Sequence, residues 1–196
     1  MAHLRPLDRE EMDDELQALY QHYENTRGFM PNSIRTMARR PNIAKRFGAL
    51  NQAVLYEGTV SEELKMLVSL ISSQASGCRY CQSHMANLSS IYKASDKKIA
   101  AVWEFESSEL FSDAERAALR LAYKASLLPN EASDGDFAEL AKHFDEGQVV
   151  EIVASVALFG FLNRWNDTMS TELETLPKQV AERALQETDW EVGKHQ

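Results

Sequence analysis

The sequence predicts an all-α protein with a single domain that spans residues 1–196. Three observations predict this fold class. Apolar residues recur at helical spacing in one segment after another, and no short segment shows the polar–apolar alternation of a half-buried strand. Residues that favour helix starts, such as Ser61 and the Ser112 to Glu115 capping box, precede the apolar patterns. A chain of this length is also long enough to bury one sizeable core.

The first third of the chain is expected to hold three helices joined by short breaks. Gly28 is a suitable residue to end the first helix, since glycine adopts the left-handed conformation common after a last turn. Pro41 interrupts the next helical pattern, because proline is disfavoured in a helix interior. The expected helices are residues 12–23, 34–39 and 43–56.

Two helices are expected in the middle of the chain, separated by Gly77. The first begins after Ser61, which can cap it, and carries an apolar stripe at helical spacing. The second begins at about Cys78 and runs to Tyr92. Its apolar stripe predicts that Cys81 and His84 share the buried face. The two stripes are Leu64, Leu67, Val68, Ile71 and Ala75, then Cys81, His84, Met85, Leu88 and Ile91.

The remaining helices are expected after Ser95 or Asp96, after Ser112, and in three segments of the C-terminal third. The helix over residues 146–169 is apolar on most faces, which is typical of a central core helix or of a subunit interface. This pattern predicts a homo-oligomer. The tail over residues 190–196 is expected to be loose. The expected helices are residues 95–104, 112–128, 133–144, 146–169 and 177–187.

Composition narrows the class of partner. The formal net charge is −9 and the pI is about 5.1, which argues against nucleic acid or an anionic membrane as the main partner. The first eight residues lack the apolar core of a signal peptide, and the apolar run over residues 149–162 is too short to span a bilayer. We therefore expect a cytoplasmic protein that binds neither nucleic acid nor a membrane.

The two cysteines carry the clearest chemical signal. Cys78 and Cys81 are the only cysteines of the chain, and His84 follows them within one helical turn. Helix N-termini stabilise thiolates, so Cys78 should be acidified by free backbone N–H groups and by the neighbouring Arg79. In a reducing compartment, two cysteines at this spacing favour redox catalysis or metal binding over a structural disulfide.

The dithiol and the histidine together predict peroxide chemistry. One thiolate can attack an O–O bond to give a sulfenic acid, and the second cysteine can resolve it to a disulfide. His84 lies one turn after Cys81, from where it can take and return a proton, directly or through one water. No cofactor is expected. A zinc site is disfavoured because Cys78, Cys81 and His84 supply only three ligands, and no other histidine stands at ligand spacing.

Three further residues are candidates for the pocket. The Tyr80 hydroxyl can hydrogen-bond a substrate, although packing also explains this residue. Asn166 and Asp167 end the most apolar helix and can line a pocket beside the dithiol. A polar network that joins subunits at the helix end explains the same pair.

The segment from Lys65 through Cys78-Arg79-Tyr80-Cys81 to His84 resembles the AhpD-like family, which includes alkylhydroperoxidases and carboxymuconolactone decarboxylases. The resemblance extends from the loop at residues 28–32 to the helix at residues 161–164 and is closest to the peroxidase-related branch. It implies an AhpD-like helical bundle that assembles into oligomers, with its CxxC-bearing core segment at about residues 61–92.

The resemblance also implies roles for the two cysteines. In this family the cysteine nearer the histidine attacks peroxide and the other resolves, so Cys81 would be peroxidatic and Cys78 resolving. The helix-terminus argument favours Cys78 as the more acidic thiol instead. At the level of sequence, the identity of the nucleophile stays open.

Two positions depart from the family pattern. The family usually places a relay glutamate where this chain has Met66, and its histidine where this chain has Met85. His84 stands one residue earlier, about 100° away around a helix. Glu63 lies one turn before Met66 and is the candidate substitute for the relay, although a solvated carboxylate near a helix start is the more ordinary role.

We therefore expect a thiol-dependent hydroperoxide reductase that cycles Cys78 and Cys81 between dithiol and disulfide, with His84 as proton shuttle. Its expected partners are a hydroperoxide and a thiol or dithiol reductant. Two alternatives stay open. One is an enzyme of the carboxymuconolactone decarboxylase type, which needs no dithiol. The other is a non-catalytic helical oligomer that binds a ligand or senses redox state.

Overall fold

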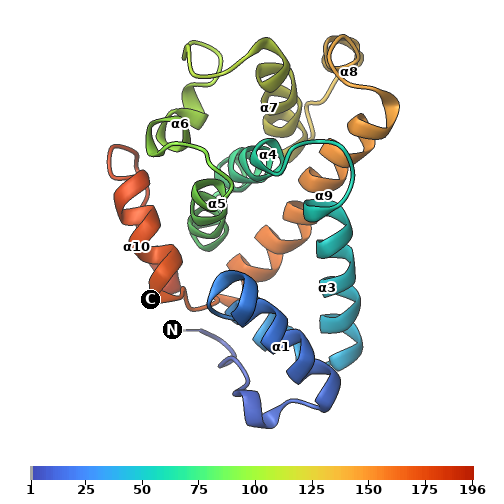
Figure 1. The fold of residues 1–196 in the computed structure, drawn as a ribbon. Coiled ribbons are helices and arrows are strands. Elements are labelled where there is room, and N and C mark those ends of the chain that lie inside the picture. The colour runs from blue at the N-terminus through green and yellow to red at the C-terminus, as the bar shows by residue number, and fades with distance from the viewer. Residues whose placement is uncertain (1) are drawn as a thin grey trace.

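The computed structural model describes residues 2–196, and within that range it contains helices and 3-10 turns but no strand. Figure 1 shows the helices gathered around a central pair, α4 and α5. This confirms the predicted all-helical class. The helices are α1 (Asp14–Arg27), α2 (Asn32–Met37), α3 (Pro41–Tyr56), α4 (Glu62–Ala75), α5 (Arg79–Ile91), α6 (Asp96–Ala100), α7 (Asp113–Ser126), α8 (Asp134–Leu140), α9 (Glu146–Met169) and α10 (Thr175–Ala184), with 3-10 turns η1 (Arg9–Glu11), η2 (Ala101–Glu104) and η3 (Gly193–His195).

The helix α4 lies at the centre of the fold, packed against α5, α7 and α9 (Figure 1). Ser61 caps its start, since the side chain accepts a hydrogen bond from the backbone N–H of Leu64. Every residue from 64 to 73 is buried, so this helix is covered on all sides. Gly77 follows with a φ of 73°, a left-handed conformation that glycine adopts without a Cβ clash. The chain can therefore reverse at this point and enter α5 directly.

The outer helices surround this pair. The helices α1 and α3 pack on each other, and α3 also contacts α4 and α9. The helix α10 lies along α5, which brings the C-terminal segment beside the CxxC helix (Figure 1). Gly28 ends α1 with a φ of 79°, as the sequence predicts, and Pro41 stands in the first turn of α3, where its missing N–H costs nothing.

The helix α9 covers 24 residues and begins and ends where the sequence predicts. Its buried face packs against α3, α4, α5 and α7. By length and composition this helix could cross a membrane, but core helices of soluble proteins can have the same length and composition. The apolar run over residues 149–162 is therefore part of a helix that is long enough to span a bilayer, which differs from the sequence prediction.

The C-terminal tail differs from its prediction. Residues 190–196 are not loose within this structure: Trp190 donates from Nε1 to the carbonyl oxygen of Arg79 at 3.2 Å, and His195 is buried. The ring of His195 bonds the carbonyl oxygen of Thr171 through Nδ1 at 2.8 Å. The sequence of the tail does not indicate this packing, because the residues that the tail contacts, Arg79 and Thr171, lie in other segments of the chain.

Candidate active site

The dithiol lies at the first turn of α5. Cys78 is the N-cap residue, and its sulfur accepts a hydrogen bond from the backbone N–H of Cys81 at 3.5 Å. Both cysteines are free thiols in this structure, and both are buried. The spacing therefore places the two thiols together at a helix N-terminus, where partial positive charge favours thiolates.

The environments of the two thiols differ. The sulfur of Cys81 accepts a hydrogen bond from Nδ2 of Asn166, in α9, at 3.3 Å. Burial raises the pKa of Cys81 well above its ordinary value, and the adjacent Cys78 thiol raises it further, while the hydrogen bond from Asn166 lowers it. Asn166 is thus the side chain that offsets part of the cost of a buried thiolate at Cys81.

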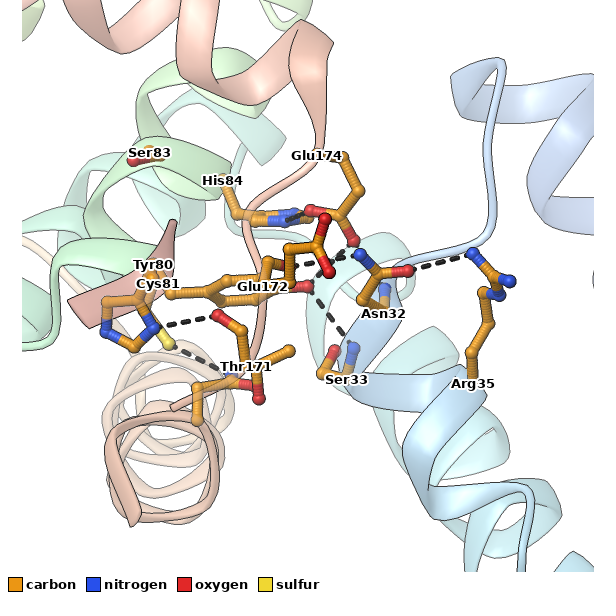
Figure 2. Close-up of polar contacts among 12 residues, drawn as sticks. Asn32, Ser33, Arg35, Tyr80, Cys81, Ser83, His84, Thr171, Glu172 and Glu174 are labelled. Atoms are coloured by element: carbon orange, nitrogen blue, oxygen red, sulfur yellow. Dashed lines mark hydrogen bonds and ion pairs between the residues drawn. The ribbon is translucent and has the colours of Figure 1, made fainter. Parts of the chain in front are cut away.

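A carboxylate holds His84 in place. Oε2 of Glu174 lies 2.7 Å from Nε2 of His84, and Oε1 of the same carboxylate accepts a hydrogen bond from the Tyr80 hydroxyl at 2.9 Å. The Tyr80 ring stacks on the His84 ring, with centroids 4.4 Å apart, and Phe29 meets the histidine edge-on. Figure 2 shows Glu174 reaching over to His84 and Tyr80. The histidine is therefore fixed on several sides.

The loop before α2 completes the binding of Glu174. The backbone N–H of Asn32 donates to Oε1 of the carboxylate, and the Asn32 side chain donates to the carbonyl oxygen of Glu172 at 3.0 Å (Figure 2). Burial alone would raise the pKa of Glu174, but the charge and hydrogen bond of His84, together with the Asn32 N–H, outweigh it and lower the pKa. Glu174 is therefore a carboxylate at neutral pH.

A small cavity joins the thiol to the histidine. Its volume is about 30 Å³, enough for about one water molecule. Cys81, His84 and Asn166 line it, whereas Cys78 does not. The rest of the wall is mostly apolar, formed by Pro31, Ile34, Phe47, Leu55, Met85, Phe159 and Leu162, with Arg27, Ser33, Asn51 and Tyr80 as its other polar residues.

The structure brings five of the proposed site residues together. Cys78, Cys81, His84, Tyr80 and Asn166 meet around α5 and the end of α9. Of the two routes expected between Cys81 and His84, directly or through one water, the direct one is not among the described contacts. The described contacts bond the Cys81 sulfur to Asn166 and Nε2 of His84 to Glu174, with no direct bond between thiol and imidazole. Any proton exchange between them has to pass through the cavity that both line.

Two expectations from the sequence, those for Glu63 and Asp167, are corrected by the packing. Glu63 is not the carboxylate bonded to His84; its own side chain bonds Lys98 at 2.9 Å. Asp167 does not line the dithiol cavity, and its carboxylate pairs with Lys194 at 2.9 Å. The cation of Arg79 pairs with Asp189 at 3.2 Å, so its charge is not directed at the thiols alone.

Glu174 is the site residue that the sequence analysis missed. It lies 90 positions after His84 and belongs to no recognisable motif. One weak signal existed: Glu174 is the N-cap residue of α10, where Ser, Thr, Asp or Asn is preferred, and its side chain makes no cap hydrogen bond. A carboxylate at that position is free to bond elsewhere.

The side chains that could ligate a metal are scattered in the described part of the chain. Across residues 2–196, no group of three or more histidine, cysteine or acidic side chains is placed to hold an ion. The polar groups around the dithiol are bonded to one another instead, as in the pairs His84–Glu174 and Asn166–Cys81.

Comparison with known proteins assigns the family. The model of the carboxymuconolactone decarboxylase family matches residues 41–124, which include the dithiol. The crystal structure of the debrominase Bmp8 is 35% identical, covers 92% of this chain and 96% of that one, and superposes with a TM-score of 0.84. The chain belongs to the carboxymuconolactone decarboxylase family. Its fold is the AhpD-like fold of that family, and known members are enzymes.

Two other proteins are similar to this chain over different lengths. A peroxidase-related protein from Ralstonia eutropha JMP134 with an AhpD core has a TM-score of 0.82 over 94% of this chain and 96% of that one, at 21% identity, so it supports the fold alone. The uncharacterized protein YnjA of Escherichia coli K12 is 32% identical over 58% of this chain. The match spans 62% of the length of YnjA.

Proposed function

We propose that this protein is a dithiol oxidoreductase in which Cys81 attacks an electrophilic acceptor and Cys78 resolves the product to a disulfide. The observation that carries the proposal is the asymmetry of the pair. Cys81 lines the cavity and is bonded by Asn166, whereas Cys78 lies beside it, outside the cavity. An acceptor in the cavity therefore meets Cys81 first. This favours the family assignment of the nucleophile over the argument from helix-terminus acidity.

An organic hydroperoxide is the first proposed acceptor. The Cys81 thiolate attacks the terminal peroxide oxygen, the O–O bond breaks, and the alkoxide leaves with a proton as an alcohol. Cys81 is then a sulfenic acid. The Cys78 thiol attacks its sulfur, a disulfide forms and water leaves. One peroxide is reduced by two electrons from two thiols, and an external thiol or dithiol returns the disulfide to the reduced state.

The His84–Glu174 pair is proposed to move the protons. Each step needs a base for a thiol proton and an acid for a leaving oxygen, and a histidine serves both needs near neutral pH. Glu174 holds the ring through Nε2 and so fixes its orientation towards the cavity. Asn166 stabilises the Cys81 thiolate meanwhile, because its amide donates to the sulfur.

A halogenated aromatic compound is the second candidate acceptor. The observation that favours it is the 35% identity with the debrominase Bmp8 over nearly the whole chain. A second structure of that protein, a cysteine-to-alanine variant, holds 2,3,4-tribromopyrrole. In the corresponding reaction here, a C–Br bond would be replaced by C–H, the two thiols would become a disulfide, and hydrogen bromide would leave. The same dithiol supplies both electrons.

Oxidation of the reduced protein distinguishes the acceptors. The protein is mixed in a stopped-flow instrument with cumene hydroperoxide or with a brominated pyrrole, free thiols are counted before and after, and released bromide is measured. We expect one acceptor to consume both thiols rapidly, and, with cumene hydroperoxide as the acceptor, a Cys78→Ser variant to stop at a sulfenic acid on Cys81. Two thiols that survive an excess of both acceptors would contradict the proposal.

The same experiments, with variants of the two cysteines, distinguish the proposed reductase from a decarboxylase and from a redox sensor. A decarboxylase needs no dithiol, so its activity would survive in a variant that carries both Cys78→Ser and Cys81→Ser. A redox sensor would oxidise only at the rate of an ordinary free thiol. The proposed reductase loses all turnover in the double variant and oxidises much faster than a free thiol.

A further inference from the structure

A second, larger cavity lies next to the dithiol cavity. It has a volume of about 510 Å³, within the range of small-molecule sites, and is formed by α1, α3 and α5. Arg27 and Asn51 line both cavities. The remaining wall consists of Leu19, His22, Tyr23, Thr26, Gly48, Ala49, Gln52, Tyr56, Leu88, Ile91 and Tyr92.

The sizes of the two cavities are complementary. About 30 Å³ beside Cys81 accommodates a reacting group of one or two atoms, but not the body of an organic acceptor. The neighbouring 510 Å³ has room for that body, and the shared residues Arg27 and Asn51 mark where the two spaces adjoin. An acceptor that extends from one cavity into the other would keep its reactive end at Cys81.

The charge of the larger cavity is unusual for this chain. The protein carries 30 acidic residues and a net charge of −9, yet no Asp or Glu is among the residues that line this cavity. Its basic side chains are Arg27 and His22, and Arg27 carries a permanent positive charge. An anion would therefore enter without facing a carboxylate.

Arg27 is presented as a recognition group. Its guanidinium lies over the rings of Tyr23 and Tyr56, at 5.1 and 5.6 Å from their centroids, and donates from Nη2 to the Tyr56 hydroxyl. No carboxylate of residues 2–196 forms an ion pair with it. A guanidinium fixed by aromatic faces keeps donors free for a planar acidic group.

We propose that this cavity binds an aromatic molecule with an acidic group, and that Arg27 pairs with the anion while the tyrosine, leucine and isoleucine side chains cover the ring. The inference rests on the proposed function, for which it supplies the class of acceptor. It predicts that the preferred acceptor carries a carboxylate or another acidic group on an aromatic body, rather than being a simple alkyl compound.

Binding of matched probes tests the inference without chemistry at the thiols. The ligands are 2-naphthoate and its neutral counterpart 2-naphthamide, measured by calorimetry on the reduced protein. We expect naphthoate to bind at least about tenfold more tightly than the amide, and Arg27→Gln to remove that difference, since a charge-assisted hydrogen bond is lost. Arg46→Gln, an exposed arginine on α3, is the control and should bind naphthoate as the wild type does.

A second variant tests the inference even if Arg27→Gln fails to fold. Ala49 lines the larger cavity only, so Ala49→Phe should fill it and weaken naphthoate binding while Arg27 stays in place. Equal affinity for naphthoate and naphthamide in the wild type, or naphthoate binding unchanged by both variants, would overturn the inference. A failure of both cumene hydroperoxide and the brominated pyrrole to oxidise the thiols contradicts the proposed function, whereas a failure to bind naphthoate contradicts only this cavity.

Discussion

At the scale of the residue, the hydrogen bond from Asn166 to Cys81 decides how reactive the buried thiol is. Desolvation disfavours a thiolate, and the amide of Asn166 is the described side chain that opposes this effect. The raised pKa means that the thiol form of Cys81 predominates at neutral pH. Its reactivity should therefore rise with pH through and beyond the ordinary range of a cysteine.

Replacing Asn166 tests this effect. Asn166→Ala should raise the pKa of Cys81 further and slow its alkylation by iodoacetamide at pH 8 by about tenfold, which corresponds to about one pKa unit. The pH profile of alkylation, measured on a Cys78→Ser background, checks the direction. Asn163→Ala, one turn earlier on α9, removes a bond to Ser72 instead and serves as the control. A profile that moves equally in both variants would contradict a specific role for Asn166.

Glu174 is a second single residue on which the proposed reaction depends, because its carboxylate holds His84, the proposed proton shuttle. Glu174→Gln should lower turnover by about 10²-fold, the lower end of what general acid–base catalysis contributes. Combining it with His84→Ala should add little further loss, since the two residues act as one unit. Steady-state turnover of the singles and the double variant is the measurement.

A neighbouring glutamate supplies the control. Glu172→Gln changes an exposed side chain two positions away, so its turnover should equal that of the wild type. Normal turnover in Glu174→Gln would show that the carboxylate is structural only. Since the pKa of Glu174 is lowered on folding, its ion pair also contributes stability above the pKa of the unfolded carboxyl, and this contribution is lost as the pH falls through the lowered value.

At the scale of the element, a buried ion pair joins α4 to α9 and fixes the frame of the site. Nζ of Lys65, which is 1% exposed, lies 2.8 Å from Oε2 of Glu151, and the same carboxylate accepts from the backbone N–H groups of Thr59 and Val60. Burial alone would raise the pKa of Glu151, but the bonds from Lys65 and the two amides lower it to about 2. The loop before α4 is thereby tied to α9.

The depressed pKa predicts how stability depends on pH. A carboxyl with an ordinary pKa of 4.5 when unfolded and about 2 when folded contributes stability above about pH 4.5, which is lost as the pH falls towards 2. Glu151→Gln should lower the free energy of unfolding at pH 7 by about 1.5–3 kcal/mol, as for other hydrogen bonds to charged groups. It should also flatten the decline between pH 5 and 3.

Urea unfolding at several pH values measures both effects. Glu146→Gln changes an exposed carboxylate of the same helix and should leave the free energy of unfolding nearly unchanged. If Glu151→Gln kept the wild-type stability at pH 7, the bonds from Lys65, Thr59 and Val60 would be too weak to fix the loop.

At the scale of the whole molecule, α9 leaves an apolar stripe on the surface. Val150, Val153, Ala157 and Phe161 follow one another at helical spacing, and all are exposed, with 67% of Val150 and 44% of Phe161 accessible. Exposed apolar patches commonly mark interaction sites. We propose, as the sequence pattern predicts, that this stripe is covered by a second copy of the chain.

Sedimentation equilibrium tests the association. We expect the wild type to sediment as an oligomer, and Val153→Glu to shift it towards the monomer, because a charge on an apolar interface is desolvated without a partner. Leu128→Glu alters an exposed leucine outside the stripe and should leave the mass unchanged. A wild type that stays monomeric at tens of micromolar would contradict the proposal.

Local pattern predicted most of the helical framework. Ser61, the Ser112 capping box and Gly28 act within a few residues of the helix ends that they specify, and α9 has the predicted bounds. The CxxC spacing likewise places both thiols at one helix start. Such features depend on neighbours along the chain, so they can be read without the fold.

The partners of the site depend on the fold. Cys81 meets Asn166, 85 positions away, and His84 meets Glu174, 90 positions away, because α5 packs against both α9 and α10. Proximity in sequence makes Glu63 a candidate for the relay, but in the folded chain its carboxylate bonds Lys98.

The sequence by itself determined the helical class, the position of the dithiol at a helix N-terminus and the AhpD-like resemblance, since each follows from spacing along one segment. The tertiary structure alone decided that Cys81 and not Cys78 lines the cavity, that Glu174 holds His84, and that Arg27 lies between two cavities. These depend on which distant side chains share a space, and helix packing fixes that choice.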